Sequence, residues 1–231
     1  KIYATTYYVI NNSLGLFMSE DEETWQQSGP QFSASAVGRD FATIYLGGYS
    51  HGLWTSRDGG NTWKQQLGHG WYGPEVYDIA SSDSITLVNS AWGLYKTTNY
   101  GSSWATIDFF NSKSVTSLYS TDKQAFVGTT QGLFMSEDLG NTWTEISYLS
   151  DYKITSINSH LGTLYIGAQT ATKTTVFATH NSIDWVDTGL NKSLVSPVTD
   201  IAFAIADPSY VYILVKNDGI YRRKTYLEPQ E

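Results

Sequence analysis

The chain has 231 residues, no cysteine and a formal net charge of −8. This length fits one large domain or two small ones, and it can bury a core without covalent staples. The absence of cysteine excludes disulfides and Cys-ligated metals. The excess of acidic residues makes nucleic acid and anionic membranes poor partners, and no apolar run is long enough for membrane insertion.

The composition points to a particular kind of surface. Charged residues make up 16% of the chain and aromatic residues 15%. The charged fraction lies below the usual quarter, so a surface rich in Ser, Thr, Asn, Tyr and Trp favours an extracellular or surface-displayed protein that faces carbohydrate. The stretch KIYATTYY at the start lacks the basic and apolar regions of a signal peptide. Because residue 1 is Lys rather than Met, we expect a processed chain or a domain excised from a longer one.

Short segments rich in β-branched and aromatic residues, bounded by Gly, Asn, Asp and Ser, recur along the chain and predict strands. No stretch shows a sustained helical period. In chain order the clearest of the predicted strands are 14–21, one starting at Trp25, 42–48, 51–58, one starting at Trp63, 76–82, 84–89, 92–99, one starting at Trp104, 115–120, 124–128, 131–138, one starting at Trp143, 154–159, 163–167, one starting at Trp185, 198–204, 210–215 and 218–225. The N-terminal residues supply the last three strands of a first unit, residues 32–185 supply four full units, and the C-terminal residues supply the first three strands of a sixth.

A tryptophan-containing turn marks the same point in successive units. The sequences SRDGGNTW (56–63), TTNYGSSW (97–104) and SEDLGNTW (136–143) are full copies, whereas SEDEETW (19–25) and THNSIDW (179–185) are one residue shorter and lack the glycine. The tryptophans at 25, 63, 104, 143 and 185 are 38, 41, 39 and 42 residues apart. A period of roughly 40 residues with four short strands predicts the blades of a β-propeller, because solenoids of that period are helical.

The expected fold class is therefore all-β, a propeller of four-stranded antiparallel blades that forms a single domain over residues 1–231. The N-terminal unit contributes three strands, the four full units sixteen and the C-terminal unit three, which makes about 22 strands. A closed ring of six four-stranded blades would have about 24 strands and a ring of five about 20. We favour six blades, with residues 225–229 (TYLEP) as the last strand. A ring of five blades with surplus strands and a fragment of a larger ring stay open.

The residue types found at each position of the repeated turn can be explained by structural roles. A hydroxyl in the first position and an acid or amide in the third can accept backbone N–H bonds from the rest of the turn. The glycine suits a positive φ, and the tryptophan can bury a large ring between neighbouring sheets. Asn99 removes the charge that a cation ligand would supply, so no metal is expected. The positions assigned to structure are Ser56, Asp58, Gly60, Trp63, Asn99, Trp104, Ser136, Asp138, Gly140 and Trp143.

The pattern S-x-D-x-G-x-T-W resembles the Asp box, also called the BNR repeat, and the resemblance extends from residue 14 to residue 225. This repeat occurs in sialidases, sortilin-type sorting receptors, xyloglucan-degrading glycosidases and a photosystem assembly factor. The resemblance implies a propeller whose ligands bind on the face opposite the Asp boxes. It leaves function open, since those families share the turn and not the chemistry.

The loops of that opposite face join the second strand to the third and the fourth strand to the next unit. They carry aromatic side chains, which can stack against sugar rings from a rigid scaffold. We therefore expect a non-catalytic binding or interaction propeller that recognises a glycan or a protein surface and uses no cofactor. The candidate ligand-binding residues are Tyr49, Trp71, Tyr72, Trp92, Phe109, Phe110, Tyr148 and Tyr152.

Three alternatives are less well supported. A sialidase needs an arginine cluster, whereas the four arginines of the chain, at 39, 57, 222 and 223, are dispersed. An inverting β-glucan hydrolase needs two carboxylates about 6.5–9.5 Å apart. Asp78 and Asp200 share one position in the first strand of their units and form the candidate pair, although each can instead bond to backbone. An assembly scaffold like the photosystem factor is the third alternative, but no basic patch is evident.

Overall fold

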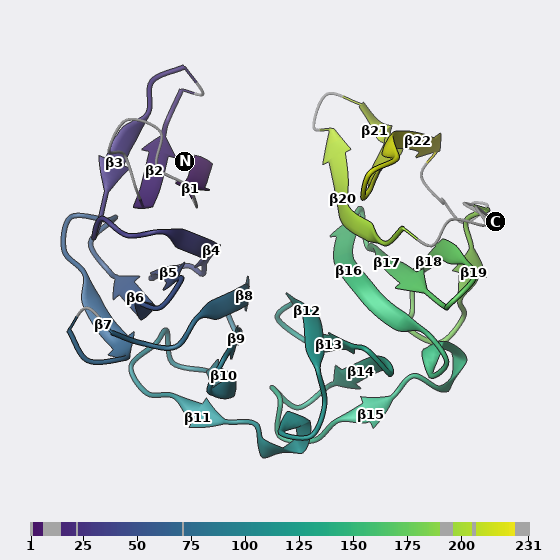
Figure 1. Cartoon of the computed structure of the whole chain (residues 1–231), viewed down its shortest axis with the longest axis horizontal. Coiled ribbons are helices and arrows are strands. Elements are labelled where there is room, and N and C mark those ends of the chain that lie inside the picture. The colour runs from purple at the N-terminus through teal and green to yellow at the C-terminus, as the bar shows by residue number, and fades with distance from the viewer. Residues whose placement is uncertain are drawn as a thin grey trace. The chain divides into compact units, whose positions relative to one another are not determined.

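A computed structural model of the chain describes residues 2–6, 15–21, 23–70, 72–189, 196–204 and 207–224. Strands dominate these residues and form six antiparallel sheets, labelled in Figure 1. The helical elements among them are two single 3-10 turns, η1 (Asp108–Phe110) and η2 (Ser147–Leu149). None of the described helices is long and apolar enough to cross a membrane.

The four central sheets have four strands each, and each is a meander in which neighbours in sequence pair in space. They are β4 (Ala34–Arg39), β5 (Ile44–Gly48), β6 (Gly52–Ser56) and β7 (Lys64–Leu67); β8 (Val76–Ser81), β9 (Thr86–Ser90), β10 (Gly93–Thr97) and β11 (Ala105–Thr106); β12 (Val115–Ser120), β13 (Ala125–Thr129), β14 (Gly132–Ser136) and β15 (Thr144–Glu145); and β16 (Lys153–His160), β17 (Thr163–Gln169), β18 (Thr174–Thr179) and β19 (Val186–Asp187).

The first and last sheets have three strands. They are β1 (Ile2–Thr6), β2 (Gly15–Ser19) and β3 (Gln26–Ser28), and β20 (Val198–Ala204), β21 (Asp207–Val215) and β22 (Gly219–Lys224). The predicted four-strand unit, the six sheets and the three-stranded units at both ends are confirmed. Each fourth strand of the complete sheets begins directly after its tryptophan, as at Lys64 after Trp63. The predicted last strand, residues 225–229, lies outside the described residues.

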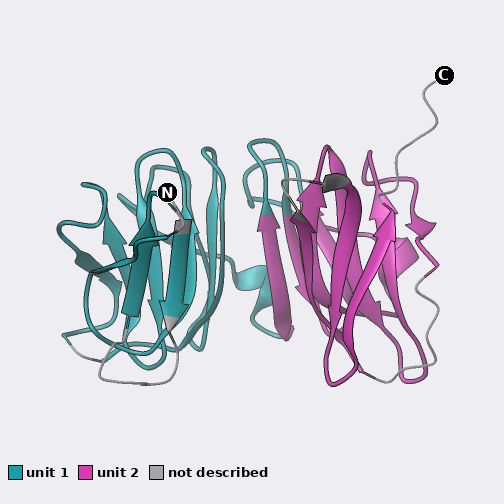
Figure 2. Ribbon diagram, turned by 90° about the horizontal axis from the view of Figure 1, so that it is seen from above, with its two compact units in different colours: residues 1–112, 120–125, 136–142 teal, residues 113–119, 126–135, 143–231 magenta. Residues whose placement is uncertain are grey.

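The chain divides into two compact units, coloured in Figure 2. Unit 1 contains residues 1–112, 120–125 and 136–142, and unit 2 contains residues 113–119, 126–135 and 143–231. The sheet β12–β15 contributes to both, because two of its turns group with unit 1 and most of its strand residues with unit 2. A single domain over the whole chain stays a prediction.

Buried residues of neighbouring sheets pack together inside each unit. In unit 1, Trp63 packs against a cluster that contains Leu16 and Phe32, and Trp104 packs against a cluster around Tyr45. The rings of Tyr45 and Trp104 meet edge to face, with centroids 5.9 Å apart. In unit 2, Trp185 packs against the cluster built around Phe177. The tryptophan of a repeat therefore contributes to packing beyond its own turn, as the sequence predicts.

Trp25 is an exception to this packing, since 43% of its surface is exposed. It belongs to the shorter copy of the turn, which lacks the glycine. The prediction that every repeated tryptophan buries its ring is wrong at this position.

The first strands of four sheets, β4, β8, β16 and β20, carry a β-bulge near their start. The pairing register shifts between Ala34 and Ala36, between Val76 and Asp78, between Ile154 and Ser156, and between Val198 and Asp200. A bulge inserts one residue and increases local twist. The residue after it, which is Asp78 or Asp200 in two of the sheets, is thereby placed at a fixed point of the repeated architecture.

The contrast between Trp104 and Trp25 gives a test of the packing. We expect Trp104→Ala to lower the free energy of unfolding by about 3 kcal/mol, because it leaves a cavity beside Tyr45. Trp25→Ala removes a largely solvated ring and should cost less than about 1 kcal/mol. Urea denaturation of both variants measures the difference, and equal losses would contradict the packing described here.

Candidate functional site

The side chains at the first and third positions of the repeated turns are hydrogen-bonded within the turn. Asp138 Oδ1 accepts the N–H groups of Asn141 and Thr142 at 3.0 and 2.8 Å, and Oδ2 accepts the Thr142 hydroxyl at 2.8 Å. The hydroxyl of Ser136 donates to Asp138 at 2.9 Å and accepts the N–H of Gly140 at 2.8 Å. Gly140 has a φ of +74°, which a side chain would strain. One acid and one hydroxyl therefore fix this turn.

The other copies use the same bonds. Asp58 accepts the N–H and the hydroxyl of Thr62 at 2.8 and 2.6 Å. In the uncharged copy, Asn99 Oδ1 accepts the Ser103 N–H at 3.0 Å and its amide donates to the Ser103 hydroxyl at 2.9 Å. The shorter copies also bond internally, as Asp21 accepts the Thr24 N–H at 2.7 Å. An amide thus replaces the acid with the same backbone acceptor role, as the sequence predicts.

The pKa values of these acids follow from that bonding. The hydroxyl and N–H of Thr62 lower the pKa of Asp58 to about 2. The N–H and hydroxyl of Thr142 lower the pKa of Asp138 to about 2 as well. Within the described residues, no group of three or more His, Cys, Asp or Glu side chains is arranged to hold a metal ion. These carboxylates therefore act as acceptors of hydrogen bonds from the backbone N–H and hydroxyl groups of their own turn.

At the opposite end of the strands, the loop 68–75 is bonded to two sheets of unit 1. The carbonyl of Pro74 accepts the N–H of Gly52 at 3.1 Å, and the carbonyl of Glu75 accepts the N–H of Ala91 at 2.8 Å. Two adjacent carbonyls therefore attach this loop to the β5–β6 turn and to the β9–β10 turn. We call the surface formed by these two turns, the loop 68–75 and η1 the loop surface.

Further contacts order the loop surface. Gln65 Nε2 donates to the carbonyl of His51 at 3.1 Å, and the His51 ring stacks on Phe32 with centroids 4.9 Å apart. His69 and Tyr72 exchange two backbone hydrogen bonds of 2.7 and 3.2 Å, which close the loop tip into a small hairpin. The loop is thus anchored at its base and closed near its tip.

Most of the aromatic candidates in unit 1 expose their rings on the loop surface. The exposed fractions are 43% for Tyr49, 81% for Tyr72, 58% for Trp92 and 48% for Phe109. Phe110, the neighbour of Phe109 on η1, is buried with 3% exposure, so its ring packs inside and is not available to a ligand. Trp71 lies outside the described residues.

Two further candidates lie in unit 2, on and beside η2. The rings of Tyr148 and Tyr152 both meet the buried ring of Phe177 edge to face, with centroids 5.4 and 5.1 Å away. Tyr148 is 54% exposed, whereas Tyr152 is half-buried. Tyr148 therefore offers a ring packed against Phe177 to solvent, whereas Tyr152 leaves less of its surface open to a ligand.

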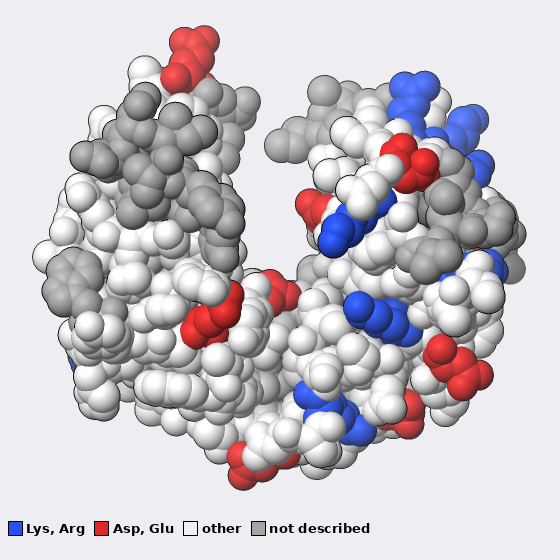
Figure 3. Space-filling view, viewed as in Figure 1, with Lys and Arg blue, Asp and Glu red and all other residues white. Residues whose placement is uncertain are grey.

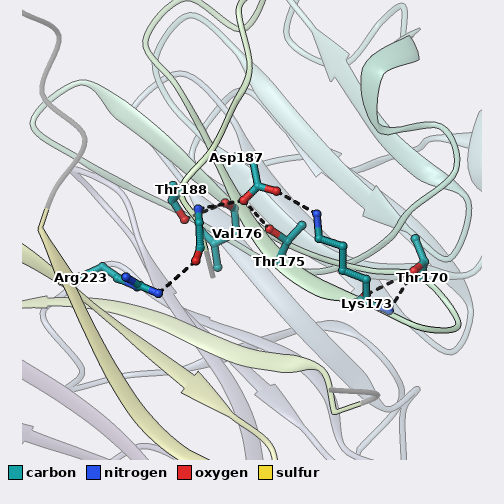
Figure 4. Close-up of polar contacts among 8 residues, drawn as sticks. Thr170, Lys173, Thr175, Val176, Asp187, Thr188 and Arg223 are labelled. Atoms are coloured by element: carbon teal, nitrogen blue, oxygen red, sulfur yellow. Dashed lines mark hydrogen bonds and ion pairs between the residues drawn. The ribbon is translucent and has the colours of Figure 1, made fainter. Parts of the chain in front are cut away.

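A charged cluster of the same unit joins the β17–β18 turn to the end of β19 (Figure 4). Lys173 Nζ donates to Asp187 Oδ2 at 2.9 Å, while Oδ1 accepts the Thr175 hydroxyl at 2.8 Å and the Gly189 N–H at 2.9 Å. Burial raises the pKa of Asp187, but the bonds from Lys173, Gly189 and Thr175 together hold that pKa below its ordinary value. Arg223 donates to the Gly189 carbonyl at 3.0 Å, which ties β22 to this corner. Sequence patterns gave no sign of this cluster.

The candidate catalytic carboxylates make local backbone bonds. Asp78 Oδ1 accepts the N–H of Ile79 and Asp200 Oδ1 accepts the N–H of Ile201, each at 2.8 Å. Asp78 lies in unit 1 and Asp200 in unit 2, and both directly follow a bulge. Asn158 makes the same bond to the N–H of Ser159 in its own first strand. The bond is therefore a feature of the first strands, and a catalytic role for the pair stays a prediction.

The four arginines have separate structural partners. Arg39 lies over the Tyr3 ring at 5.9 Å and Arg222 over the Tyr210 ring at 4.4 Å. Arg57 donates to the Tyr100 carbonyl and to the Ser102 hydroxyl. On the face drawn in Figure 3, basic side chains gather at the upper right, in the region of β22, and the other charged side chains of both signs lie among uncharged ones.

Comparisons with solved structures assign the fold. The chain is similar to a GH74 xyloglucanase from Xanthomonas campestris, with a TM-score of 0.68 and 13% identity over 96% of this chain and 42% of the enzyme. It is similar to the extracellular domain of BT4673 from B. thetaiotaomicron, with a TM-score of 0.69 and 16% identity over 98% of this chain and 34% of that one. It is also similar to YCF48 from Cyanidioschyzon merolae, with a TM-score of 0.61 and 14% identity over 88% of this chain and 71% of that one.

These likenesses establish a β-propeller fold and nothing finer, because identities below 20% are shared by propellers of different functions. The chain spans less than half the length of the xyloglucanase and of the BT4673 domain. No family model and no curated protein sequence matches it.

The lowered pKa values of the turn acids predict an acid-sensitive stability. The pKa of Asp58 and of Asp138 is about 2 in the folded chain, below the ordinary value of about 3.9 for an unfolded Asp. The unfolded state therefore takes up protons first, so the stabilisation is complete above about pH 5 and is lost as the pH falls towards 2.

We expect the double variant Asp58→Asn/Asp138→Asn to lose less stability between pH 5 and pH 2 than the parent. Thermal melts across that pH range measure the loss, and carbon-detected NMR titration reports the two carboxyl groups directly. Parallel pH profiles for the parent and the variant would contradict the assignment.

Proposed function

We propose that the chain is a non-catalytic binding propeller, extracellular or displayed on a surface, whose ligand is a glycan. The observation that carries the proposal is the loop surface, where Tyr49, Tyr72, Trp92 and Phe109 expose aromatic rings on loops bonded to two sheets. Exposed rings on a fixed backbone can stack on sugar rings without a large loss of conformational freedom. The extracellular BT4673 domain among the structural neighbours agrees with this setting.

The same proposal assigns the repeated turns to the Asp-box class and to a structural role. Their carboxylates are occupied by bonds within the turn, so they offer little to a ligand. Tyr148 of unit 2 is a further ligand-contacting residue on this proposal, because its exposed ring is fixed against Phe177. A protein surface is the second ligand class, since exposed Tyr and Trp side chains also serve as anchors in protein interfaces.

The loop surface can be tested by matched aromatic substitutions. We expect Tyr72→Ala and Trp92→Ala each to weaken glycan binding at least tenfold, on the order of 1.4 kcal/mol, without lowering the melting temperature. Phe41→Ala is the control, because Phe41 is 80% exposed but lies in the β4–β5 turn at the other end of the sheet.

A glycan array identifies the ligand, and titration calorimetry with that ligand compares the three variants. Equal weakening by Phe41→Ala would show that the loss is not specific to the loop surface. Absence of glycan binding, together with a protein partner whose capture depends on Trp92, would replace the glycan by a protein ligand.

The enzymatic alternative is a glycoside hydrolase acting on a β-glucan, as suggested by the likeness to GH74 xyloglucanases. It would use Asp78 and Asp200, whose backbone bonds favour a structural role. We expect no release of reducing sugar from xyloglucan or mixed-linkage β-glucan by the purified chain. Release that Asp78→Asn abolishes, in a variant with an unchanged melting temperature, would establish the alternative.

An assembly scaffold is the third candidate, because YCF48 is also a structural neighbour. Beyond the group of basic side chains in the region of β22, the described residues of the face drawn in Figure 3 form no extended basic patch. This candidate therefore has less support than a glycan-binding propeller.

A further inference from the structure

A hollow at the turn end of unit 1 has no role in the proposal above. It has a volume of about 340 Å³ and lies where the β6–β7 turn meets the next repeated turn. Its lining includes Arg57, Trp63, Lys64, Gln66 and Ser102, and every lining residue is basic or uncharged. We call it the Arg57–Lys64 groove. In a chain with 22 acidic and 14 basic residues, two cations and no acid in one hollow reverse the overall charge balance.

Arg57 is held in place within this groove. Its Nη2 group donates to the carbonyl of Tyr100 at 2.5 Å and to the hydroxyl of Ser102 at 2.7 Å. Tyr100 has a φ of +57°, so its peptide adopts the left-handed conformation of the neighbouring turn, and its carbonyl also accepts the Thr43 hydroxyl. These two bonds use one nitrogen of the guanidinium, and its remaining N–H groups make no bond within the described residues.

Lys64 supplies a second cation to the lining of the groove. It is exposed at the start of β7 and makes no ion pair or side-chain hydrogen bond within the part of the chain that the structure describes. Asp58 belongs to the same turn, but its carboxylate accepts bonds from Ser56 and from Thr62. The Asp58 carboxylate keeps its negative charge, but it is not part of the lining, so the N–H groups of Arg57 and Lys64 that have no bond within the described residues can donate to an external anion.

The other lining groups favour a ring-shaped polar ligand over a simple ion. The N–H of the Trp63 indole is occupied by the carbonyl of Gly60 at 3.0 Å, so its contribution to the groove is apolar ring surface. The Gln66 amide bonds to the Thr55 hydroxyl at 2.9 Å, which fixes two further polar groups of the lining. The volume lies at the lower end of the range for small-molecule sites.

The first repeat provides a comparison within the same chain. A hollow at the equivalent position is lined by Met18, Glu20, Asp21, Thr24 and Gln26, with Glu20 in the place of Arg57. The repeated architecture thus produces the hollow, whereas its charge depends on the individual residues. The two cations of the Arg57–Lys64 groove are consequently not required by the fold.

We propose that the Arg57–Lys64 groove binds an anionic sugar, through charge-assisted hydrogen bonds from Arg57 and Lys64 to a carboxylate or sulfate group and through contact of the sugar ring with Trp63. This site lies at the opposite end of the strands from the loop surface, so it does not depend on the glycan proposal made above. The acid group selects the ligand, because a neutral sugar offers no partner to the two cations.

The test uses the whole chain and titration calorimetry with defined probes. These are digalacturonic acid for a carboxylate, a sulfated chondroitin disaccharide for a sulfate, neutral cellobiose, inorganic sulfate and a tetra-aspartate peptide. We expect one of the two acidic sugars to bind, at least tenfold more tightly than cellobiose or inorganic sulfate. Binding should weaken when sodium chloride is raised from about 0.05 to about 0.5 M, because salt screens exposed charges.

Substitution of Lys64 separates the groove from other sites. We expect Lys64→Gln to weaken acidic-sugar binding at least about tenfold, since one charge-assisted hydrogen bond is lost, and Lys64→Arg to restore it. Lys123→Gln makes the same charge change at an exposed lysine of the β12–β13 turn and should leave binding unchanged. Because the Lys64 side chain has no partner among the residues that the structure describes, none of these variants should alter the melting temperature.

Several outcomes would overturn the proposal. They are the absence of binding by both acidic sugars, equal binding of cellobiose or of inorganic sulfate, equal binding of the tetra-aspartate peptide, and unchanged affinity in Lys64→Gln. Arg57→Gln is a second variant, in which lost binding with an unchanged melting temperature supports a ligand contact. NMR shifts confined to the loop surface on adding the acidic sugar would also contradict the groove.

Discussion

The turn between the third and fourth strands, whose polar side chains are hydrogen-bonded within the turn, is the constraint on which the rest of the fold depends. A short polar side chain at its third position captures the N–H groups that follow, and a glycine permits the reversal. The turn thereby binds several of its own backbone N–H groups. It delivers the tryptophan at a fixed point, where the ring packs against residues of a neighbouring sheet, as Trp104 does against Tyr45. Local hydrogen bonding thereby directs long-range packing.

Different kinds of interaction order the two ends of the strands. At the turn end, cations reach from one repeat to backbone acceptors of the next: Arg57 bonds to Tyr100, and Lys96 bonds to the carbonyl of Leu139 and to Asn141. Tyr100 and Leu139 occupy the same position and both have a positive φ, so each carbonyl is presented to the preceding repeat in the same way. At the loop end, backbone bonds fix the chain and aromatic side chains stay exposed.

Much of the fold was predictable because the pattern repeats. Five tryptophans at nearly equal spacing and the glycines before three of them define the sheets, and the strand count at each end agrees with the structure. The exposure of single rings was not predictable, since Phe109 and Phe110 are neighbours in sequence and only the geometry of η1 buries one of them. The Arg57–Lys64 groove and the Lys173–Asp187 cluster were not predictable from the sequence for a related reason. Their residues are distant in sequence or lie at positions that vary between repeats.

The attachment of the loop 68–75 through Pro74 and Glu75 has a consequence for how such a surface can change. The two carbonyls that join this loop to neighbouring sheets stand at its last residues, whereas the exposed ring of Tyr72 lies before them. Residues between Gly68 and Tyr72 can therefore be inserted, deleted or exchanged while the spacing of the sheets is kept by the bonds to Gly52 and Ala91. The chain thus separates a tip that can be changed from a base that is bonded to the sheets, as hypervariable loops are separated from an antibody framework, and new specificities can be grafted there without redesigning the sheets.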